Sequence, residues 1–409
     1  MQQDKQDVAV LRDLAKRVAD IAAKEVQDQR RELWRRHNSL QRTRPLVYVR
    51  WFSVWWEILE PQLQCSDPLF RRAELALRDK IYQDRLGDDV IIEPWLTIRA
   101  THAGPPDARR WGPEIRHSSK TAAKGSWQFR PPLVEEADLD KLVMPDHRID
   151  EQATARDLHR LTEAIGDILP VAVDRAPRYR HDISYEMAQL VGLEQMMLYM
   201  IDRPEWLHRL GAFLRDGTLR THEQAEKAGD WRLLNHYNQA MPYALELDDP
   251  AANGRPVGRA QLWTHAASQE TTLVSPAMFD EFILTYQIPI TAKFGLSAFG
   301  CCEDLTKKID LLRKIPNLRR IAVTPWADLG RCAEQIGTDY VLSWRPNPAE
   351  MVSRGFDPQR VRRIIREGLE ITRGCHVDIT LKDIETVGGN FDNLIHWTRI
   401  VRELVEDCA

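Results

Sequence analysis

The chain has 409 residues, which is enough to bury a large core. Its 57 basic and 61 acidic residues are interleaved and give a formal net charge of −4, which excludes the basic surface of a nucleic-acid-binding protein. Six cysteines are too few for a disulfide framework, and no run of about 18 apolar residues occurs. We therefore expect a cytoplasmic protein without a membrane span.

The N-terminal segment is predicted to be helical. Between Asp4 and His37, apolar residues such as Leu11, Leu14 and Val18 recur at helical spacing among charges, which indicates one long amphipathic helix. We assign residues 1–42 to this segment and residues 43–409 to the main domain. A stretch at 102–132, rich in Gly, Pro and Ser, predicts a long loop of the kind that often covers a site.

Short apolar runs alternate with helical patterns through the rest of the chain. Repeated β-then-α units predict a parallel sheet, and their number favours a closed (β/α)8 TIM barrel over an open doubly wound sheet. No Gly-x-Gly-x-x-Gly turn or Walker loop supports nucleotide binding. The nine predicted strands, one more than a barrel needs, lie at 46–49, 89–92, 167–173, 231–237, 257–264, 294–299, 318–323, 340–344 and 375–381.

Residues that follow the strands are the expected functional residues, because barrel sites lie at the carboxyl ends of the strands. Tryptophan recurs there, which favours a flat apolar wall for a planar substrate, although such residues also cap cores. We predict His265 and Glu270 as acid/base groups and Asp378 as a further catalytic group. The predicted substrate-binding residues are Arg50, Trp51, Trp95, His236, Tyr237, Trp263, Trp326, Arg345 and Lys382.

The sequence Gly300-Cys301-Cys302-Glu303 is the most informative motif. Two thiols and a carboxylate at the end of a predicted strand indicate a soft metal or a reactive thiolate, while buried packing is the alternative. Cys375 opens the last predicted strand, close to His376. Two thiolates with Glu303 or His376 are suited to hold zinc and leave one position open for catalysis.

The C-terminal half resembles the uroporphyrinogen decarboxylase superfamily. The resemblance rests on the Gly-Cys-Cys-Glu motif and on matches at 274–282, 315–320, 324–326, 345–349 and 381–384, which are spread over about a third of the chain. It implies a (β/α)8 barrel, in agreement with the alternation of elements.

Within that superfamily the chain is more similar to the corrinoid-dependent zinc methyltransferases than to the porphyrinogen decarboxylases. The decarboxylases carry two arginines near the first strand, where this chain has only Arg50 before Trp51. The methyltransferases bind zinc through His-x-Cys and a second Cys, and Cys301 and Cys375 match these cysteines. Phe299 stands at the position of the family histidine. The resemblance therefore implies zinc bound by Cys301, Cys302, Glu303 and Cys375, with Glu303 as the replacement ligand.

These observations predict a zinc-dependent methyltransferase. It would move a methyl group between a small methylated substrate, such as a methoxylated aromatic in O-demethylation, and the corrinoid (cobalamin-type cofactor) of a partner protein. One alternative is a metal-free decarboxylase in which Arg50, Arg345 and Lys382 bind carboxylates and Asp174 or Asp378 stabilises a protonated ring. Another is a non-catalytic ligand-binding subunit. We expect no nucleic-acid or membrane partner, and a homodimer is compatible with the sequence.

Overall fold

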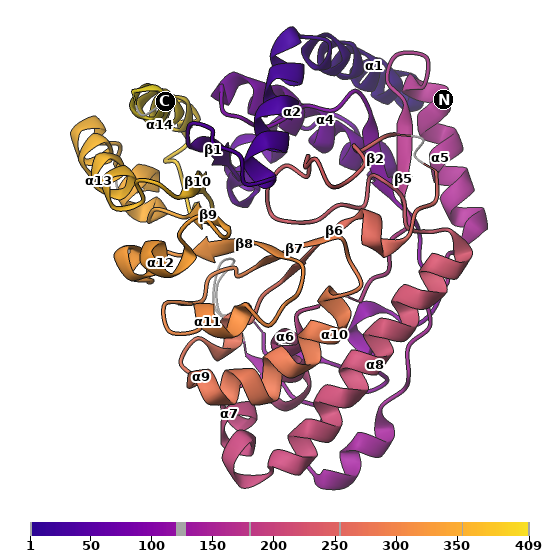
Figure 1. The fold of residues 1–409 in the computed structure, drawn as a ribbon. Coiled ribbons are helices and arrows are strands. Elements are labelled where there is room, and N and C mark those ends of the chain that lie inside the picture. The colour runs from indigo at the N-terminus through magenta and orange to yellow at the C-terminus, as the bar shows by residue number, and fades with distance from the viewer. Residues whose placement is uncertain (1, 120–127, 180, 253–254, 354, 408–409) are drawn as a thin grey trace.

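A six-stranded parallel sheet forms the centre of the fold, in a computed structural model that describes residues 2–119, 128–179, 181–252, 255–353 and 355–407. The strand order is β1-β10-β9-β8-β7-β6 (Figure 1). A second parallel pair joins β2 to β5, and a short antiparallel pair joins β3 to β4. The strands are β1 (Leu46–Val49), β2 (Leu96–Arg99), β3 (Arg116–His117), β4 (Phe129–Arg130), β5 (Val171–Asp174), β6 (Trp263–Ala266), β7 (Leu296–Phe299), β8 (Leu318–Val323), β9 (Val341–Trp344) and β10 (His376–Leu381).

The main sheet does not close into the predicted (β/α)8 barrel. Among the described residues, β1 and β6 are edge strands, and the β2–β5 pair is separate from them. The parallel α/β class and many of the strands agree with the prediction. The sheet stays open because two of the expected strands, at 89–92 and 231–237, are absent.

The predicted strand at 89–92 is an irregular segment beside β1. The backbone N–H groups of Val47 and Val49 donate to the carboxylates of Asp89 and Asp88, at 2.8 and 2.9 Å. Aspartate side chains thus occupy the donors that a neighbouring strand would otherwise use. One further hydrogen bond, from the N–H of Asp89 to the carbonyl of Val47, keeps the segment against the edge.

The predicted strand at 231–237 is also irregular. It contacts β6, the other edge strand, through one hydrogen bond from the N–H of Tyr237 to the carbonyl of Trp263 at 3.3 Å. Asn235 Nδ2 donates to Asp174 at the end of β5, at 2.6 Å. Individual hydrogen bonds, rather than a strand ladder, therefore link β5 to β6.

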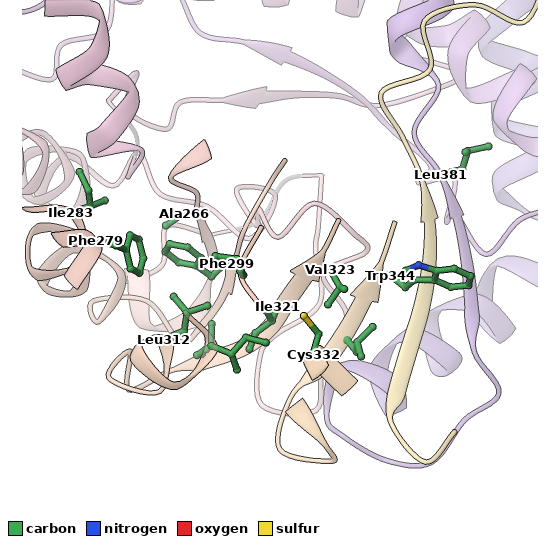
Figure 2. Close-up of a cluster of buried hydrophobic side chains, with 14 of the residues drawn as sticks. Ala266, Phe279, Ile283, Phe299, Leu312, Ile321, Val323, Cys332, Trp344 and Leu381 are labelled. Atoms are coloured by element: carbon green, nitrogen blue, oxygen red, sulfur yellow. The ribbon is translucent and has the colours of Figure 1, made fainter. Parts of the chain in front are cut away.

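The outer face of the sheet carries the main hydrophobic core. Successive side chains of a strand alternate between its faces, so Phe299, Val323 and Trp344 all point to the same side. Figure 2 shows these side chains with Phe279, Leu312 and Cys332 from neighbouring segments. Phe299 is therefore a core residue, facing away from the inner side of the sheet.

The inner face is polar. Arg320 on β8 donates to Asp378 on β10 at 2.8 Å, and Ser343 on β9 donates to the same carboxylate at 2.8 Å. His37 Nε2 lies 3.4 Å from Asp378. Arg320 and Asp378 are almost completely buried, so this ion pair lies in the interior of the protein.

Helices cover the outer face of the sheet. Helices α11, α12 and α13 lie beside β7, β8 and β9, and the long helix α8 runs past the β6 side (Figure 1). The α-helices are α1 (Gln2–Ala22), α2 (Glu25–Asn38), α3 (Trp55–Ile58), α4 (Pro68–Leu86), α5 (Glu151–Ile165), α6 (Ile183–Val191), α7 (Leu193–Asp202), α8 (Pro204–Ala228), α9 (Pro276–Phe279), α10 (Thr285–Thr291), α11 (Ile309–Leu312), α12 (Leu329–Ile336), α13 (Pro358–Ile371) and α14 (Asp392–Glu406).

The N-terminal segment forms two helices where one was expected. Lys24 has an extended backbone, with ψ of 136°, and separates α1 from α2. Its ammonium group pairs with Asp84 of α4 at 2.7 Å. The break lets α1 pack on α4 and α5 while Trp34 of α2 packs beside β1.

The predicted 102–132 loop contains the β3–β4 pair, and residues 120–127 lie outside the described part of the chain. No helix among the described residues combines the length and the apolar character needed to cross a bilayer.

Candidate active site

The two adjacent cysteines follow β7 at the carboxyl edge of the sheet. Gly300 makes the turn that places them there, with a φ of 102° that a side chain would disfavour. A Cβ at this position would also lie 2.8 Å from Leu305 and 3.0 Å from Ala322. Cys301 is partly buried and Cys302 is exposed, and their sulfur atoms are 3.6 Å apart.

Cationic groups that follow β9 and β10 converge on Cys301. Lys382, just after β10, donates from Nζ to Cys301 Sγ at 3.2 Å. Arg345, just after β9, donates from NH1 to the carbonyl oxygen of Cys301. The hydrogen bond from Cys302, together with Lys382 and Arg345, holds the pKa of Cys301 well below the ordinary value of a thiol. Cys301 is therefore placed to be a thiolate at neutral pH.

Cys302 and Asp383 complete the polar surroundings of the thiolate. The hydrogen bond with Cys301, followed by burial, raises the pKa of Cys302, so the pair consists of one thiolate and one S–H donor. Cys302 Sγ also lies 3.3 Å from Asp383 Oδ2, and Asp383 pairs with Lys382 at 3.1 Å. Asp383 has a φ of 56°, a left-handed conformation that costs energy for a non-glycine residue and often marks functional sites.

Gln239 connects two arginines at this edge. Its side-chain oxygen accepts from Arg50 NH1 at 2.8 Å and from Arg345 NH2 at 3.0 Å. Its amide nitrogen lies 2.8 Å from Nε2 of His265. Burial lowers the pKa of His265 to about 3, so this imidazole is neutral at physiological pH. His265 thus positions Gln239 and is a poor proton acceptor, which differs from the predicted acid/base role.

Glu303 holds the cysteine loop in shape. Its fully buried carboxylate accepts the N–H of Cys301 at 2.7 Å and the N–H of Ser268 at 2.8 Å. These bonds engage both carboxylate oxygens with the backbone. Glu303 therefore shapes the turn, whereas the sequence predicted it as a metal ligand.

Zinc does not fit the four predicted ligands. Cys375 precedes β10, whereas Cys301 and Cys302 follow β7. Because the strands are parallel, Cys375 lies at their amino ends and the other two cysteines lie at their carboxyl ends. The six residues of β10 span about 20 Å. Cys375 Sγ instead contacts the carbonyl oxygen of Ala333 at 3.7 Å. In the described ranges, no three His, Cys, Asp or Glu side chains group in a way that suits a metal ion, and an ammonium group already contacts Cys301.

Two further predicted catalytic residues lie outside the cysteine cluster. Asp378 is fully buried under the site; burial would raise its pKa, but Arg320, His37 and Ser343 lower it overall. Glu270 accepts from Ser184 Oγ at 2.8 Å, and burial raises its pKa. Asp378 is therefore a structural carboxylate, and Glu270 is tied to α6.

The predicted tryptophans do not form one wall. Trp51 is buried and stacks on Tyr82, with ring centroids 5.8 Å apart, and Trp95 is buried just before β2. Trp263 is buried and donates to the carbonyl of Pro242, at 2.7 Å. Trp326 is 72 % exposed. These four tryptophans therefore lie in separate parts of the molecule and do not share a surface.

Two hollows lie where the strand ladder is interrupted. The β1–β2 cleft, of about 490 Å³, has Arg50 and Trp51 among its walls. A smaller cavity of about 160 Å³ between β5 and β6 is lined by His236, Tyr237 and Trp263, among others. Tyr237 also contacts His265 edge-on, with ring centroids 5.2 Å apart. Seven of the nine predicted substrate-binding residues thus fall into three groups: the cleft, the cavity and the cysteine cluster. Trp95 and Trp326 belong to none of them.

Gln239 is the site residue that sequence reasoning missed. It lies in an irregular segment with a left-handed φ of 59°, and glutamine carries no signature of a site by itself. Only its position between two guanidinium groups reveals its importance.

Comparisons with known proteins give a fold and no family. No protein-family model matches the chain. No curated protein matches it either. Among solved structures, it is similar to a methyltransferase from Methanosarcina mazei, with a TM-score of 0.50, 13 % identity, and coverage of 91 % of this chain and 98 % of the other. At this identity the similarity is one of fold, and the superfamily resemblance stays a prediction.

Proposed function

We propose that the protein is a methyltransferase in which the Cys301 thiolate is the nucleophile. It would move a methyl group between a small methylated substrate, with a methoxylated aromatic as the first choice, and a corrinoid protein. The contact between Lys382 Nζ and Cys301 Sγ, at 3.2 Å, carries the proposal. The fold shared with a methyltransferase supports it.

The chemistry of the first half-reaction is a substitution at the methyl carbon. The Cys301 sulfur forms a bond to the methyl carbon as the bond from that carbon to the substrate oxygen breaks, and the bonding electron pair leaves with the oxygen. Lys382 donates a proton to that oxygen. The products are a thioether at Cys301 and the demethylated alcohol or phenol.

The same cations suit the return of the methyl group. A thiolate of low pKa is a weaker nucleophile and a better leaving group than an ordinary thiolate. Once Lys382 has regained a proton from solvent, it and Arg345 stabilise Cys301 as the sulfur departs from the methyl carbon. The corrinoid of the partner would take up or supply the methyl group.

Exposed apolar side chains support an approach of the partner at this edge. Phe52 follows β1 and is 50 % exposed, and Trp326 follows β8 and is 72 % exposed. Large exposed apolar groups are typical of contact surfaces. Both lie near the carboxyl ends of their strands, where Cys302 is also exposed.

The test is methylation of Cys301 by a named donor. Incubation with free methylcobalamin should yield a peptide in which Cys301 carries a methyl group, detected by mass spectrometry. The Cys301→Ser variant should lose the modification and the Cys302→Ser variant should keep it at a lower rate. If the Cys301→Ser variant consumed methylcobalamin at the wild-type rate, the thiolate mechanism would be refuted.

Metal-free decarboxylation is the second candidate, favoured by the three cations Arg50, Arg345 and Lys382. It requires no thiolate, so its activity should survive Cys301→Ser. Of the acids expected to assist, Asp378 is engaged by Arg320 and Asp174 by Asn235. A ligand-binding subunit would bind small molecules without methylation of Cys301.

A further inference from the structure

Arg50 and Arg345 lack a carboxylate partner. The negative groups beside Cys301 are engaged elsewhere: Asp383 pairs with Lys382, and both oxygens of the buried Glu303 carboxylate accept backbone N–H groups. In the part of the chain that the structure describes, no carboxylate forms an ion pair with either arginine. A ligand carboxylate would therefore meet two guanidinium groups that have no anionic partner.

The two arginines share an acceptor that is weak for them. Arg50 NH1 and Arg345 NH2 both donate to the neutral oxygen of Gln239, at 2.8 and 3.0 Å. Arg345 is 4 % exposed, and its buried Nε has no hydrogen-bond partner. A buried guanidinium with an unused donor is costly unless a ligand supplies the acceptor. Carboxylates suit paired guanidinium donors better than an amide does.

A largely apolar hollow, which Asp79 and Lys80 also line, begins at the same place. Arg50 lines the β1–β2 cleft, and its guanidinium lies over the ring of Phe52, 5.3 Å from the centroid. The volume of about 490 Å³ falls in the range of small-molecule sites. Its apolar walls include Trp51, Phe52, Trp55, Ile92, Leu96 and Met241.

We infer that the substrate carries a carboxylate, which binds Arg50 and Arg345 in place of the Gln239 oxygen, and an apolar ring, which occupies the β1–β2 cleft. The inference rests on the proposed function and names its substrate class. Arg345 also holds the carbonyl of Cys301, so the bound carboxylate lies beside the reactive sulfur. The methyl group to be transferred is then close to the carboxylate on the substrate. An aromatic acid with a methoxy group next to its carboxylate meets both requirements.

The test is equilibrium binding, measured by calorimetry without turnover. The probe is 2-methoxybenzoate, compared with the neutral 2-methoxybenzamide of the same shape. The charged probe should bind roughly 10- to 100-fold more tightly, as expected for charge-assisted hydrogen bonds. Equal affinities, or no binding of 2-methoxybenzoate, would overturn the inference.

The Gln239→Glu variant gives a second, independent measurement. A carboxylate at this position satisfies both arginines from within, so the variant should unfold at a higher temperature and bind 2-methoxybenzoate roughly 10- to 100-fold more weakly. The exposed Gln152→Glu on α5 makes the same charge change away from the site and should bind as wild type does. Unchanged binding by Gln239→Glu would contradict the placement.

The two proposals fail in different ways. If only the methyltransferase proposal is wrong, the charged probe still binds more tightly than the amide while Cys301 stays unmethylated by methylcobalamin. If only the substrate class is wrong, Cys301 is methylated and the two probes bind alike.

Discussion

Lys382 and Cys301 meet at the carboxyl edge of the sheet, with 3.2 Å between Nζ and Sγ. They are 81 positions apart in the chain, on the loops after β10 and β7. The hydrogen bond from Cys302 and this contact with Lys382 together lower the pKa of Cys301, so the pair consists of a thiolate and an S–H donor. This relationship, more than the Cys-Cys sequence itself, identifies the reactive group.

Lys382→Met should make Cys301 less reactive toward iodoacetamide. Removing the ammonium group raises the pKa of Cys301 toward its ordinary value of about 8.5, so less thiolate is present at neutral pH. We expect the alkylation rate at pH 6.5 to fall about tenfold and its pH profile to move to higher pH. Peptide mass spectrometry after timed alkylation measures both.

Asp383→Asn is the matched control for that prediction. It changes the charge at the next position, and asparagine tolerates the left-handed φ of 56°. Because it removes a negative charge, it should not raise the pKa of Cys301. Equal slowing by both variants would show that loop disruption, and not charge, controls the reactivity.

Arg320→Met should destabilise the fold strongly. Asp378 would then be a buried carboxylate without its guanidinium partner at 2.8 Å, and losing one member of such a pair costs about 3–5 kcal/mol. Denaturant unfolding measures the loss. Arg313→Met breaks a pair with Asp339 whose side chains are 37 % and 62 % exposed, and it should change stability by less than about 1 kcal/mol.

Gly368→Ala should overpack the outer core. A Cβ at Gly368 of α13 would lie 2.0 Å from the Trp344 ring, so the helix or the indole must move, at a cost of about 1–3 kcal/mol. Gly330→Ala on α12 is the control, since its nearest contact is an ordinary 3.5 Å. There the lower entropy of the unfolded alanine should stabilise the protein by about 0.5–1 kcal/mol. Thermal unfolding of the two variants tests the contrast.

Asp79→Asn should stabilise the protein only at higher pH. Burial raises the pKa of Asp79 to about 6, whereas in the unfolded chain an aspartate titrates near its ordinary value of about 3.9. Between these values the folded state holds a proton that the unfolded state has released, so wild-type stability falls as pH rises through this window.

Asparagine cannot ionise and can still accept from Trp55 Nε1, now 3.1 Å from Asp79. The variant should gain about 1–2 kcal/mol over wild type at pH 8 and almost nothing at pH 4. Unfolding in urea at the two pH values measures the difference. A gain of the same size at both would assign the effect to packing instead of ionisation.

Much of the sheet could be predicted from local patterns. The apolar run at 318–323 is β8, and the run at 46–49 is β1, because buried parallel strands read as short apolar segments. The segment at 89–92 reads in the same way but is not a strand. Asp88 and Asp89 bind the edge of β1 with their side chains, which no hydrophobic pattern can reveal.

The sequence by itself determined that parallel β-α units place polar residues after buried strands, and it singled out Cys301, Arg345 and Lys382 on that basis. Only the tertiary structure decided which of those residues meet. Cys375 lies at the start of its strand, so parallel pairing carries it to the edge opposite Cys301, while Gln239 arrives from an irregular loop between two arginines. Strand position along the chain is a local property, but the neighbours of a strand end depend on the packing of the whole sheet.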